Sequence, residues 1–141
     1  MNKEDYLKLE NQLCFPLYVC SKEIIKKYTP YLEKIDLTYT QYIVMMVLWE
    51  QPKMTVKELG KKLFLDSGTL TPLLKKLENK EYIERNRSIK DERNLIVSIT
   101  KKGKDLKEKA QYIPKEVGKC INLSQEDAIN LYKILYKIVS K

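Results

Sequence analysis

Residues 65–78, Leu65-Asp-Ser-Gly-Thr-Leu-Thr-Pro-Leu-Leu-Lys-Lys-Leu-Glu78, form the stretch that decides the fold predicted for this chain. Asp66 and Ser67 can accept hydrogen bonds from the free amides of a first helical turn. Pro72 has no amide hydrogen and is best tolerated in a first turn, so we expect it there or just inside, with a modest bend. Leucines recur at i, i+3, i+4 and i+7, as on the apolar face of an amphipathic helix: Leu70, Leu73, Leu74 and Leu77.

The opposite face of this helix carries short polar side chains at its beginning and cations towards its end. Its members are Ser67, Gly68, Thr69, Thr71, Lys75 and Lys76. Such a face suits a helix whose N-terminal end contacts base edges in a major groove while its lysines meet phosphates. An ordinary solvated surface helix explains these residues equally well when they are taken alone. The neighbouring segments distinguish it from a DNA-binding helix.

Two capping patterns precede this stretch and predict the helices that pack against it. Thr38-Tyr-Thr-Gln41 is a capping box for a helix through residues 42–50, which are nearly all apolar. Thr55-Val-Lys-Glu58 is a second capping box and opens a short helix with its apolar residues facing inward. Two short helices joined by a brief turn, the second with an exposed polar N-terminus, make a helix-turn-helix.

After Glu78 the sequence changes from helical to strand periodicity. Tyr82-Ile-Glu-Arg85 and Leu95-Ile-Val-Ser-Ile99 are predicted to pair as a hairpin, the wing of a winged helix-turn-helix. Asp91 is expected to hold Arg93 in a bidentate ion pair. The hairpin tip gathers cations that suit phosphates and a narrow minor groove: Arg85, Arg87, Lys90 and Arg93. A solvated hairpin loop remains the alternative interpretation.

Apolar stripes also lie outside this central unit, on both sides of it. Residues 3–28 are predicted to form one helix that is kinked at Pro16 and closes before Pro30. A helix that breaks at Pro114 and a last helix capped by Ser124 follow the wing. Because neither end has a core of its own, we expect these faces to pair with those of a second copy.

The predicted fold class is mainly α with a small β-hairpin wing. A winged helix-turn-helix DNA-binding domain would occupy residues 36–103. Residues 1–35 and 104–141 would supply dimerisation helices, which make the protein an obligate homodimer with two-fold symmetry.

Composition limits the function that this fold could serve. A net charge of +8, from 27 Lys and Arg against 19 Asp and Glu, favours an anionic partner such as double-stranded DNA. The chain has no histidine, no P-loop and no G-x-G-x-x-G, which argues against an enzyme and against a cofactor or metal. Three cysteines, no secretory segment and apolar runs too short for a bilayer predict a reduced, cytoplasmic protein without a membrane partner.

The wing carries a family resemblance. Asp91-Glu-Arg93-Asn-Leu-Ile-Val-Ser-Ile99-Thr100 resembles the D-x-R-(x5)-L-T signature of MarR-type winged-helix repressors, with Ile99 in place of leucine. Leu9-Glu-Asn-Gln-Leu-Cys14-Phe and the stretch that begins at Leu65 are similar to the thiol-based branch that senses organic hydroperoxides (OhrR-like) and to its staphylococcal relatives, the redox-responsive global regulators. The resemblance covers essentially the whole chain. It implies a homodimeric repressor that binds a palindromic operator and responds to an oxidant.

The resemblance also implies that Cys14 is the redox-sensing thiol. In that branch tyrosines of the partner subunit hydrogen-bond the sensing cysteine, and the matching positions here are Tyr28 and Tyr39. Tyr18 lies one helical turn from Cys14, on the same face. Phenol donors favour a thiolate, and oxidation to sulfenic acid would disturb them and respace the two recognition helices. A small buried hydrophobic side chain is the alternative role for Cys14.

The other two cysteines are expected to differ in role. Cys120 falls where two-cysteine members of the family carry a second cysteine, which implies an intersubunit disulfide with Cys14 on oxidation. The alternative is that Cys120 stays a free thiol and a small thiol caps Cys14. Cys20 lies about 120° around the helix from Cys14 and is expected in the core.

Two other functions are compatible with the sequence. One is a repressor of the same fold that is gated by a small aromatic ligand, with an inert Cys14. The other is a thiol-dependent peroxide-reducing enzyme, which would need an activating group beside Cys14 and would leave the cationic wing unexplained.

Overall fold

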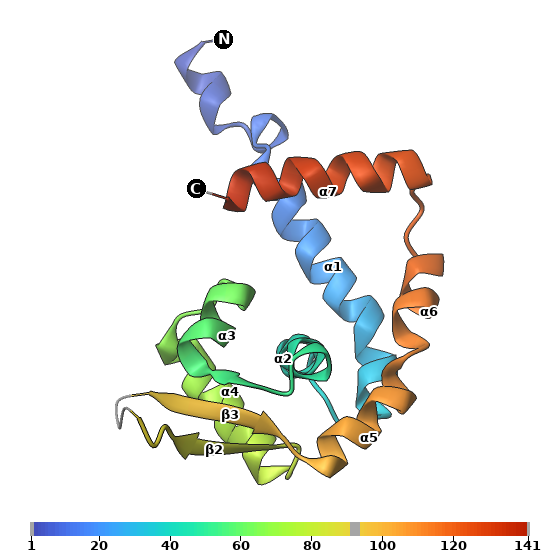
Figure 1. Cartoon of the computed structure of the whole chain (residues 1–141). Helices are drawn as coiled ribbons and strands as arrows, with labels where there is room; N and C mark the ends of the chain where they lie inside the picture. Colours follow the sequence, from blue (N-terminus) through green and yellow to red (C-terminus); the bar gives the residue numbers. More distant parts are fainter. Residues whose placement is uncertain (1, 91–93, 141) are drawn as a thin grey trace.

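A computed structural model describes residues 2–90 and 94–140 of the chain. The elements in chain order are the 3-10 turns η1 (Lys3–Leu7) and η2 (Leu9–Asn11), α1 (Cys14–Glu33), α2 (Tyr39–Glu50), β1 (Lys53–Thr55), α3 (Val56–Leu63), α4 (Ser67–Asn79), β2 (Ile83–Arg87), β3 (Leu95–Ile99), α5 (Lys101–Ala110), α6 (Ile113–Lys119) and α7 (Gln125–Val139). Helices α2, α3 and α4 pack against a small sheet at one side of the molecule, and the long helix α1 rises from this unit towards α7, which crosses it in this view (Figure 1). The predicted mainly α fold with a β-hairpin wing is confirmed.

The helix-turn-helix forms where the capping patterns placed it. The Thr38 hydroxyl accepts a hydrogen bond from the Gln41 amide, and the Gln41 side chain accepts one from the Thr38 amide at 3.1 Å, so α2 begins with a complete capping box. Thr55 caps α3 by accepting from the Glu58 amide at 3.1 Å. Helix α3 ends at Phe64, whose φ of 56° turns the chain towards α4.

The sheet has one strand more than the sequence predicted. Strands β2 and β3 pair antiparallel as expected, from Ile83 opposite Ile99 to Arg87 opposite Leu95. Strand β1 adds to the other edge of β3, giving the order β1-β3-β2. The sequence had indicated only a break here, because β1 has three residues and a run that short shows no periodicity.

One hydrophobic core joins the helix-turn-helix to the sheet and to the helices that follow it. Met45 and Leu48 of α2 lie at its centre and are fully buried. The predicted apolar face of α4 is buried against them: Leu70, Leu73, Leu74 and Leu77. The segment after the wing also enters this core, through Leu106, Ala110, Ile113 and Val117. The first part of the predicted C-terminal dimerisation segment therefore packs within its own chain.

The first helix begins later and ends later than predicted. It starts at Cys14, after the two 3-10 turns, so Pro16 falls in its first turn, where a missing amide hydrogen costs nothing. The expected kink at Pro16 is therefore wrong. The helix also continues through Pro30 to Glu33, because burial of Leu32 (1% exposed) outweighs the local cost of the proline.

The other two helix prolines had different outcomes. Pro114 was misplaced: it lies in the first turn of α6 and does not end the preceding helix, which stops at Ala110. Pro72 is the sixth residue of α4, just inside the first turn, which is the second of its two predicted placements. The error at Pro114 follows from uncertainty about where the helix starts, since a proline is assigned to a turn only by counting from that start.

The two long outer helices leave apolar surface uncovered. Leu32 is the one buried residue of α1, all of which the structure describes, and none of the described residues of α7 is buried. The exposed large side chains of α7 are Ile129, Leu131, Tyr132, Ile134, Leu135, Tyr136, Ile138 and Val139. No helix in the described part of the chain is both long and apolar enough to cross a membrane.

Candidate nucleic-acid interface and cysteine site

The outer face of α4 is exposed along its whole length. Ser67, Gly68, Thr69 and Thr71 are exposed on its first turns, and the leucines on the other face hold the helix against the core. The carboxylate of Asp66 accepts the Thr69 amide at 2.8 Å, and this hydrogen bond lowers the pKa of Asp66. The face therefore presents short donors and acceptors at the positive end of a helix dipole.

Packing within the chain does not require a glycine at position 68, and the same is true of Gly118. A Cβ built at Gly68 would meet the Asp66 side chain at 3.4 Å, an ordinary contact distance. By contrast, a Cβ at Gly60 of α3 would lie 2.7 Å from the Leu65 carbonyl oxygen, so Gly60 allows α3 and the turn to approach closely. A glycine inside a helix costs roughly 0.5–1 kcal/mol relative to alanine. Gly68 carries that cost without an internal reason, which fits close approach by an external partner.

The cations beside this face divide into two groups. Lys75 and Lys76 are exposed on α4, and Arg87 is exposed at the end of β2. Arg85 instead turns back towards α4: its Nη2 donates to Glu78 Oε1 at 3.1 Å, its amide donates to Glu78 Oε2 at 3.0 Å, and its side chain is only 15% exposed. The hydrogen bond from Arg85 lowers the pKa of Glu78. Arg85 therefore holds the wing against α4, the second helix of the helix-turn-helix and hence its recognition helix.

The predicted wing tip is described only in part. The Ser88 amide donates to the Asn94 carbonyl oxygen at 2.7 Å and closes the hairpin beyond the last strand pair. The expected pair of Asp91 with Arg93 lies outside the described residues.

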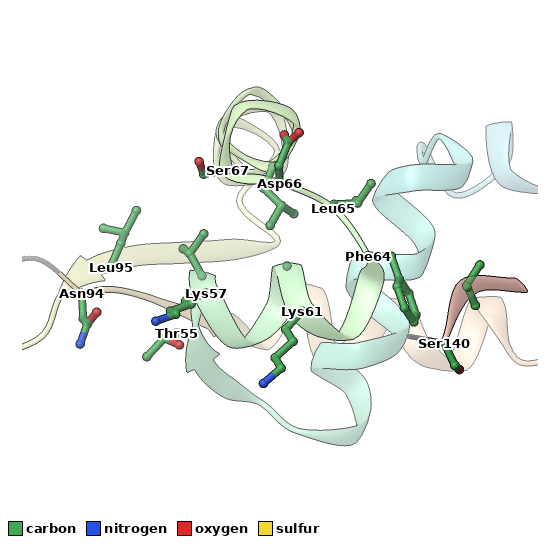
Figure 2. A pocket seen from close by; sticks show the side chains of 14 residues that line it. Thr55, Lys57, Lys61, Phe64, Leu65, Asp66, Ser67, Asn94, Leu95 and Ser140 are labelled. Atoms are coloured by element: carbon green, nitrogen blue, oxygen red, sulfur yellow. The ribbon is translucent and has the colours of Figure 1, made fainter. Parts of the chain in front are cut away.

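A wide cavity of about 1080 Å³ lies beside the start of α4 (Figure 2). Lys57 and Lys61 of α3 line it, with Ser67 from α4, Asn94 from the wing and Ser140 from beyond the end of α7. Its walls thus combine apolar side chains with two cations and the carboxylate of Asp66, next to the exposed first turn of α4. Among the described residues no group of three or more acidic or cysteine side chains could hold a metal ion.

The three cysteines are all exposed and unpaired by disulfides in the single chain. Cys14 is the first residue of α1, and Tyr18 follows one turn later with its ring 5.0 Å from Lys22 Nζ. Cys120 caps the end of α6, and its thiol donates to the Glu116 carbonyl oxygen at 3.7 Å. The expectation that Cys20 packs in the core is wrong for this chain, because only the far end of α1 is buried.

The structure brings Tyr28 and Tyr39 together with Tyr42, which the sequence had not singled out. The ring centroids of Tyr28 and Tyr39 lie 5.1 Å apart, and those of Tyr28 and Tyr42 lie 5.7 Å apart. Burial raises the pKa of Tyr28 and Tyr39, and raises the pKa of Tyr42 to about 12. The three phenols therefore stay protonated near neutral pH and can donate hydrogen bonds. Tyr42 could have been identified from the sequence, because it follows Tyr39 by three residues on the predicted apolar helix and so shares its helix face.

Within one chain the thiol and this tyrosine cluster are far apart. Cys14 and Tyr28 lie on the same helix, α1, fourteen residues apart. At a rise of 1.5 Å per residue, their backbones are about 21 Å apart. Tyr18, near Cys14, is likewise distant from the cluster. The structure thus places the Cys14 thiol at the start of α1 and Tyr28, with Tyr39 of α2 packed on it, towards the other end of that helix.

A helix-turn-helix followed by a braced hairpin, with a polar face open at the start of the second helix, defines a winged-helix transcriptional regulator. The model of the transcriptional regulator SarA/Rot family matches residues 26–110. The chain belongs to the SarA/Rot family of transcriptional regulators.

Individual relatives agree with this assignment. The chain is 54% identical over 133 residues to the HTH-type transcriptional regulator SarZ of Staphylococcus saprophyticus, covering 94% of this chain and 91% of the relative. It is 48% identical over 138 residues to the organic hydroperoxide resistance transcriptional regulator of Bacillus subtilis, covering 98% and 94% of the two chains. The resemblance to the hydroperoxide-related branch and to the staphylococcal regulators is confirmed.

The solved structures of AbfR of Staphylococcus epidermidis are similar in fold. Reduced AbfR bound to DNA matches with a TM-score of 0.80 at 32% identity, over 98% of this chain and 96% of that chain. AbfR with a disulfide formed matches with a TM-score of 0.67 at 32% identity, over 98% and 97%. AbfR has therefore been seen both on DNA and oxidised.

Proposed function

We propose that this chain is a homodimeric, redox-sensing repressor that binds a palindromic DNA operator and leaves it when Cys14 is oxidised. The observation that carries the proposal is the exposed polar face of α4, which combines short hydroxyls and an unconstrained Gly68 at its start with lysines further along. This arrangement fits base edges in a major groove flanked by phosphates. The similarity to DNA-bound AbfR supports it.

The contacts divide by chemistry. Ser67, Gly68, Thr69 and Thr71 would meet base edges, since their side chains are short and exposed. Phosphates would be met by Lys75, Lys76 and Arg87, with Arg93 entering the minor groove and Asp91 holding it. Arg85 would act through Glu78 by holding the wing at a fixed angle to α4.

Dimerisation explains the uncovered apolar faces of α1 and α7. Burial of apolar surface stabilises by roughly 25 cal/mol per Å², so these two faces favour association with a second copy. The domain at residues 36–103 would then contact DNA, while the uncovered faces of α1 and α7, within the flanking segments 1–35 and 104–141, form the dimer. A two-fold axis near the middle of α1 would bring Cys14 of each protomer beside the partner subunit's Tyr28 and Tyr39.

The thiol chemistry then follows from this pairing. Phenol donors would stabilise the Cys14 thiolate, whose sulfur attacks the outer oxygen of an organic hydroperoxide. The O–O bond breaks, sulfur is oxidised to a sulfenic acid, and the peroxide leaves as an alcohol after taking up a proton. A sulfenic acid oxygen cannot keep the hydrogen bonds that the phenols gave to sulfur, so the interface rearranges and the two α4 helices lose their spacing.

Cys120 is proposed to resolve the oxidised Cys14. Its thiol would attack the sulfenic sulfur, forming an intersubunit disulfide and releasing water. Cys120 is exposed at the end of α6, which allows such an attack, and the disulfide form of AbfR supports this route. A small cellular thiol attacking the same sulfur would give a mixed disulfide instead.

The test compares operator binding before and after treatment with cumene hydroperoxide, for wild type, Cys14→Ser and Cys20→Ser. Cys20 is the matched control, because it is an exposed thiol on the same helix. We expect wild type and Cys20→Ser to lose operator binding on oxidation by at least about tenfold, a typical coupling. Cys14→Ser should bind the operator and ignore the peroxide. A peroxide response that survives in Cys14→Ser contradicts the redox role of this thiol.

A second candidate is a repressor gated by a small aromatic anion. The cavity lined by Lys57 and Lys61 beside the start of α4 favours it, since two cations there could hold a carboxylate. Titration of the reduced, operator-bound dimer with salicylate tests it. Release that persists in Cys14→Ser and is lost in Lys57→Ala would establish this route.

A further inference from the structure

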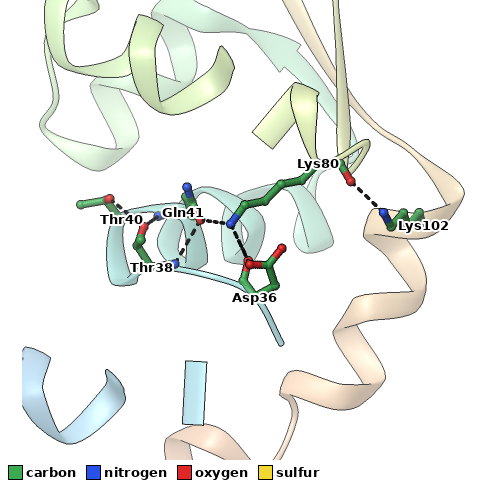
Figure 3. A network of polar contacts seen from close by, with 6 residues as sticks. All are labelled: Asp36, Thr38, Thr40, Gln41, Lys80 and Lys102. Carbon is green, nitrogen blue, oxygen red and sulfur yellow. Dashed lines mark hydrogen bonds and ion pairs between the residues drawn. The ribbon is translucent and has the colours of Figure 1, made fainter. Parts of the chain in front are cut away.

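A network of polar contacts holds the C-terminal end of α4 (Figure 3). Lys80 follows the last residue of α4, and its ammonium donates to the Asp36 carbonyl oxygen at 2.7 Å and to Gln41 Oε1 at 3.0 Å. Asp36 Oδ1 lies 3.3 Å from the same nitrogen. An ammonium has three donors, and these acceptors match that number. Lys80 is therefore held in place, with its side chain 27% exposed.

The acceptors of Lys80 belong to a rigid part of the chain. Gln41 is 2% exposed and is the buried polar residue within the described ranges 2–90 and 94–140. Its Oε1 also accepts the Thr38 amide, so one oxygen serves both the capping box of α2 and Lys80. Asp36, with a φ of 55°, forms the turn between α1 and α2. Lys80 thus joins the end of the recognition helix to the start of α2.

The same first turns of α2 carry part of the tyrosine cluster. Tyr39 and Tyr42 flank Gln41 in the sequence, and both rings pack on Tyr28 of α1. Gln41 lies between Tyr39 and Tyr42 in the same first turns of α2, so the three side chains share one stretch of backbone. The polar connection between the cluster and the recognition helix therefore runs through Gln41 and the Lys80 ammonium, beside the apolar packing of α4 on Met45 and Leu48.

The end of α4 is also fastened from the other side. The Lys102 ammonium donates to the Lys80 carbonyl oxygen at 2.9 Å, and the Thr100 hydroxyl donates to the Glu81 carbonyl oxygen at 2.6 Å. The 13 residues of α4 span about 20 Å, so a small rotation at this end becomes a larger displacement at Ser67.

We propose that Lys80 is a positioning residue that couples the tyrosine cluster to the orientation of the recognition helix. This inference rests on the proposed redox function and adds the connection by which the thiol site reaches α4. With the ammonium in place, rearrangement around Tyr39 pulls on Lys80 and tilts the helix. Without it, only the apolar packing of α4 on α2 remains, and rearrangement of the cluster moves α4 less.

The test measures the operator dissociation constant of reduced and peroxide-oxidised protein by fluorescence anisotropy, and uses their ratio as the readout. Lys80→Met keeps the aliphatic stem and removes the ammonium. Lys109→Met, at an exposed lysine of α5, is the charge-matched control. We expect the oxidised-to-reduced ratio to fall about tenfold in Lys80→Met and to stay at the wild-type value in Lys109→Met. Mass spectrometry confirms equal oxidation of Cys14 in each sample.

A purely structural role for Lys80 would lower the melting temperature and leave this ratio unchanged, and that result would overturn the inference. Lys80→Gln is measured in parallel, because it keeps a neutral donor and secures a folded variant should the methionine variant unfold; we expect its ratio to fall as well. If the wild-type ratio is itself close to one, the proposed redox function fails, and the coupling fails with it. If wild type responds and both folded Lys80 variants respond equally, only the coupling fails.

Discussion

The side chain of Glu78 shows how one residue can join two elements. It lies on the recognition helix and accepts two hydrogen bonds from Arg85 of β2, one from the backbone and one from the guanidinium. The sequence placed Arg85 among the cations of the wing, because residue type and spacing describe charge and not direction. The pairing of two residues on different elements depends on the turn between them, which here includes Glu81 at a φ of 66°. Side-chain partners were therefore the least predictable part of the candidate site.

Glu78→Gln should make the protein less stable at neutral pH by about 1 kcal/mol, because a charge-assisted hydrogen bond is weakened in a partly exposed setting. The pKa of Glu78 is lowered in the folded protein, so its contribution is complete above the ordinary glutamate value of 4.5 and is lost as pH falls through the lower folded pKa. Urea denaturation of both proteins at pH 7 and pH 3 measures this. The difference between them should shrink at pH 3. A difference that persists there would contradict the role given to the ionised carboxylate.

At the scale of elements, local patterns predicted the starts of helices that have a capping side chain, but not the start of α1, which has none. Thr38, Thr55 and Ser124 each cap a helix as predicted. A helix cap is a hydrogen bond between residues two or three positions apart, so a few adjacent residues are enough to predict it. Helix α1 continues through Pro30 because of packing that lies far away in the sequence, and β1 exists because β3 offers it an edge. Those features depend on tertiary contacts that no short window contains.

Gly68→Ala tests whether the start of α4 is shaped by an external partner. A Cβ has room there, and alanine favours helix over glycine, so the free energy of unfolding should stay equal or rise by up to about 1 kcal/mol. Operator affinity should fall several-fold, since a methyl group would hold the helix away from the DNA. Urea denaturation and anisotropy provide the two measurements.

Gly60→Ala is the matched comparison for this pair of neighbouring helices. Its new Cβ would lie 2.7 Å from the Leu65 carbonyl oxygen, so this variant should lose stability. Equal operator affinity in wild type and Gly68→Ala would remove Gly68 from the proposed interface.

At the scale of the whole molecule, a single chain is incomplete on two of its helices. The sequence predicted apolar stripes at both ends and a two-fold dimer to cover them, and the structure leaves the stripes on α1 and α7 exposed. The tyrosine cluster forms within one chain, but the thiol that it is proposed to serve lies at the other end of α1. The proposed pairing of Cys14 with tyrosines of the partner subunit came from the family resemblance. Neither composition nor residue spacing could have predicted it.

Ile138→Asp should convert the protein to monomers, because it puts a charge into the proposed α7 interface, where Ile138 is 60% exposed in the single chain. Sedimentation equilibrium compares its mass with that of wild type. Lys137→Asp, one residue earlier on the same helix, is the control and should remain dimeric. Monomeric wild type at micromolar concentration would contradict the proposed assembly.

The separation of Cys14 from Tyr28 along one helix has a consequence for the timing of peroxide detection. In a newly made monomer, the Cys14 thiol has no tyrosine hydroxyl of the cluster near it, and the tyrosine cluster has no thiol. Before dimerisation, Cys14 would react with peroxide as slowly as an ordinary surface thiol. The monomer would also have no operator to release. Competence to report oxidative stress would be acquired only at assembly, and each dimer would hold two detectors that neither polypeptide possesses alone.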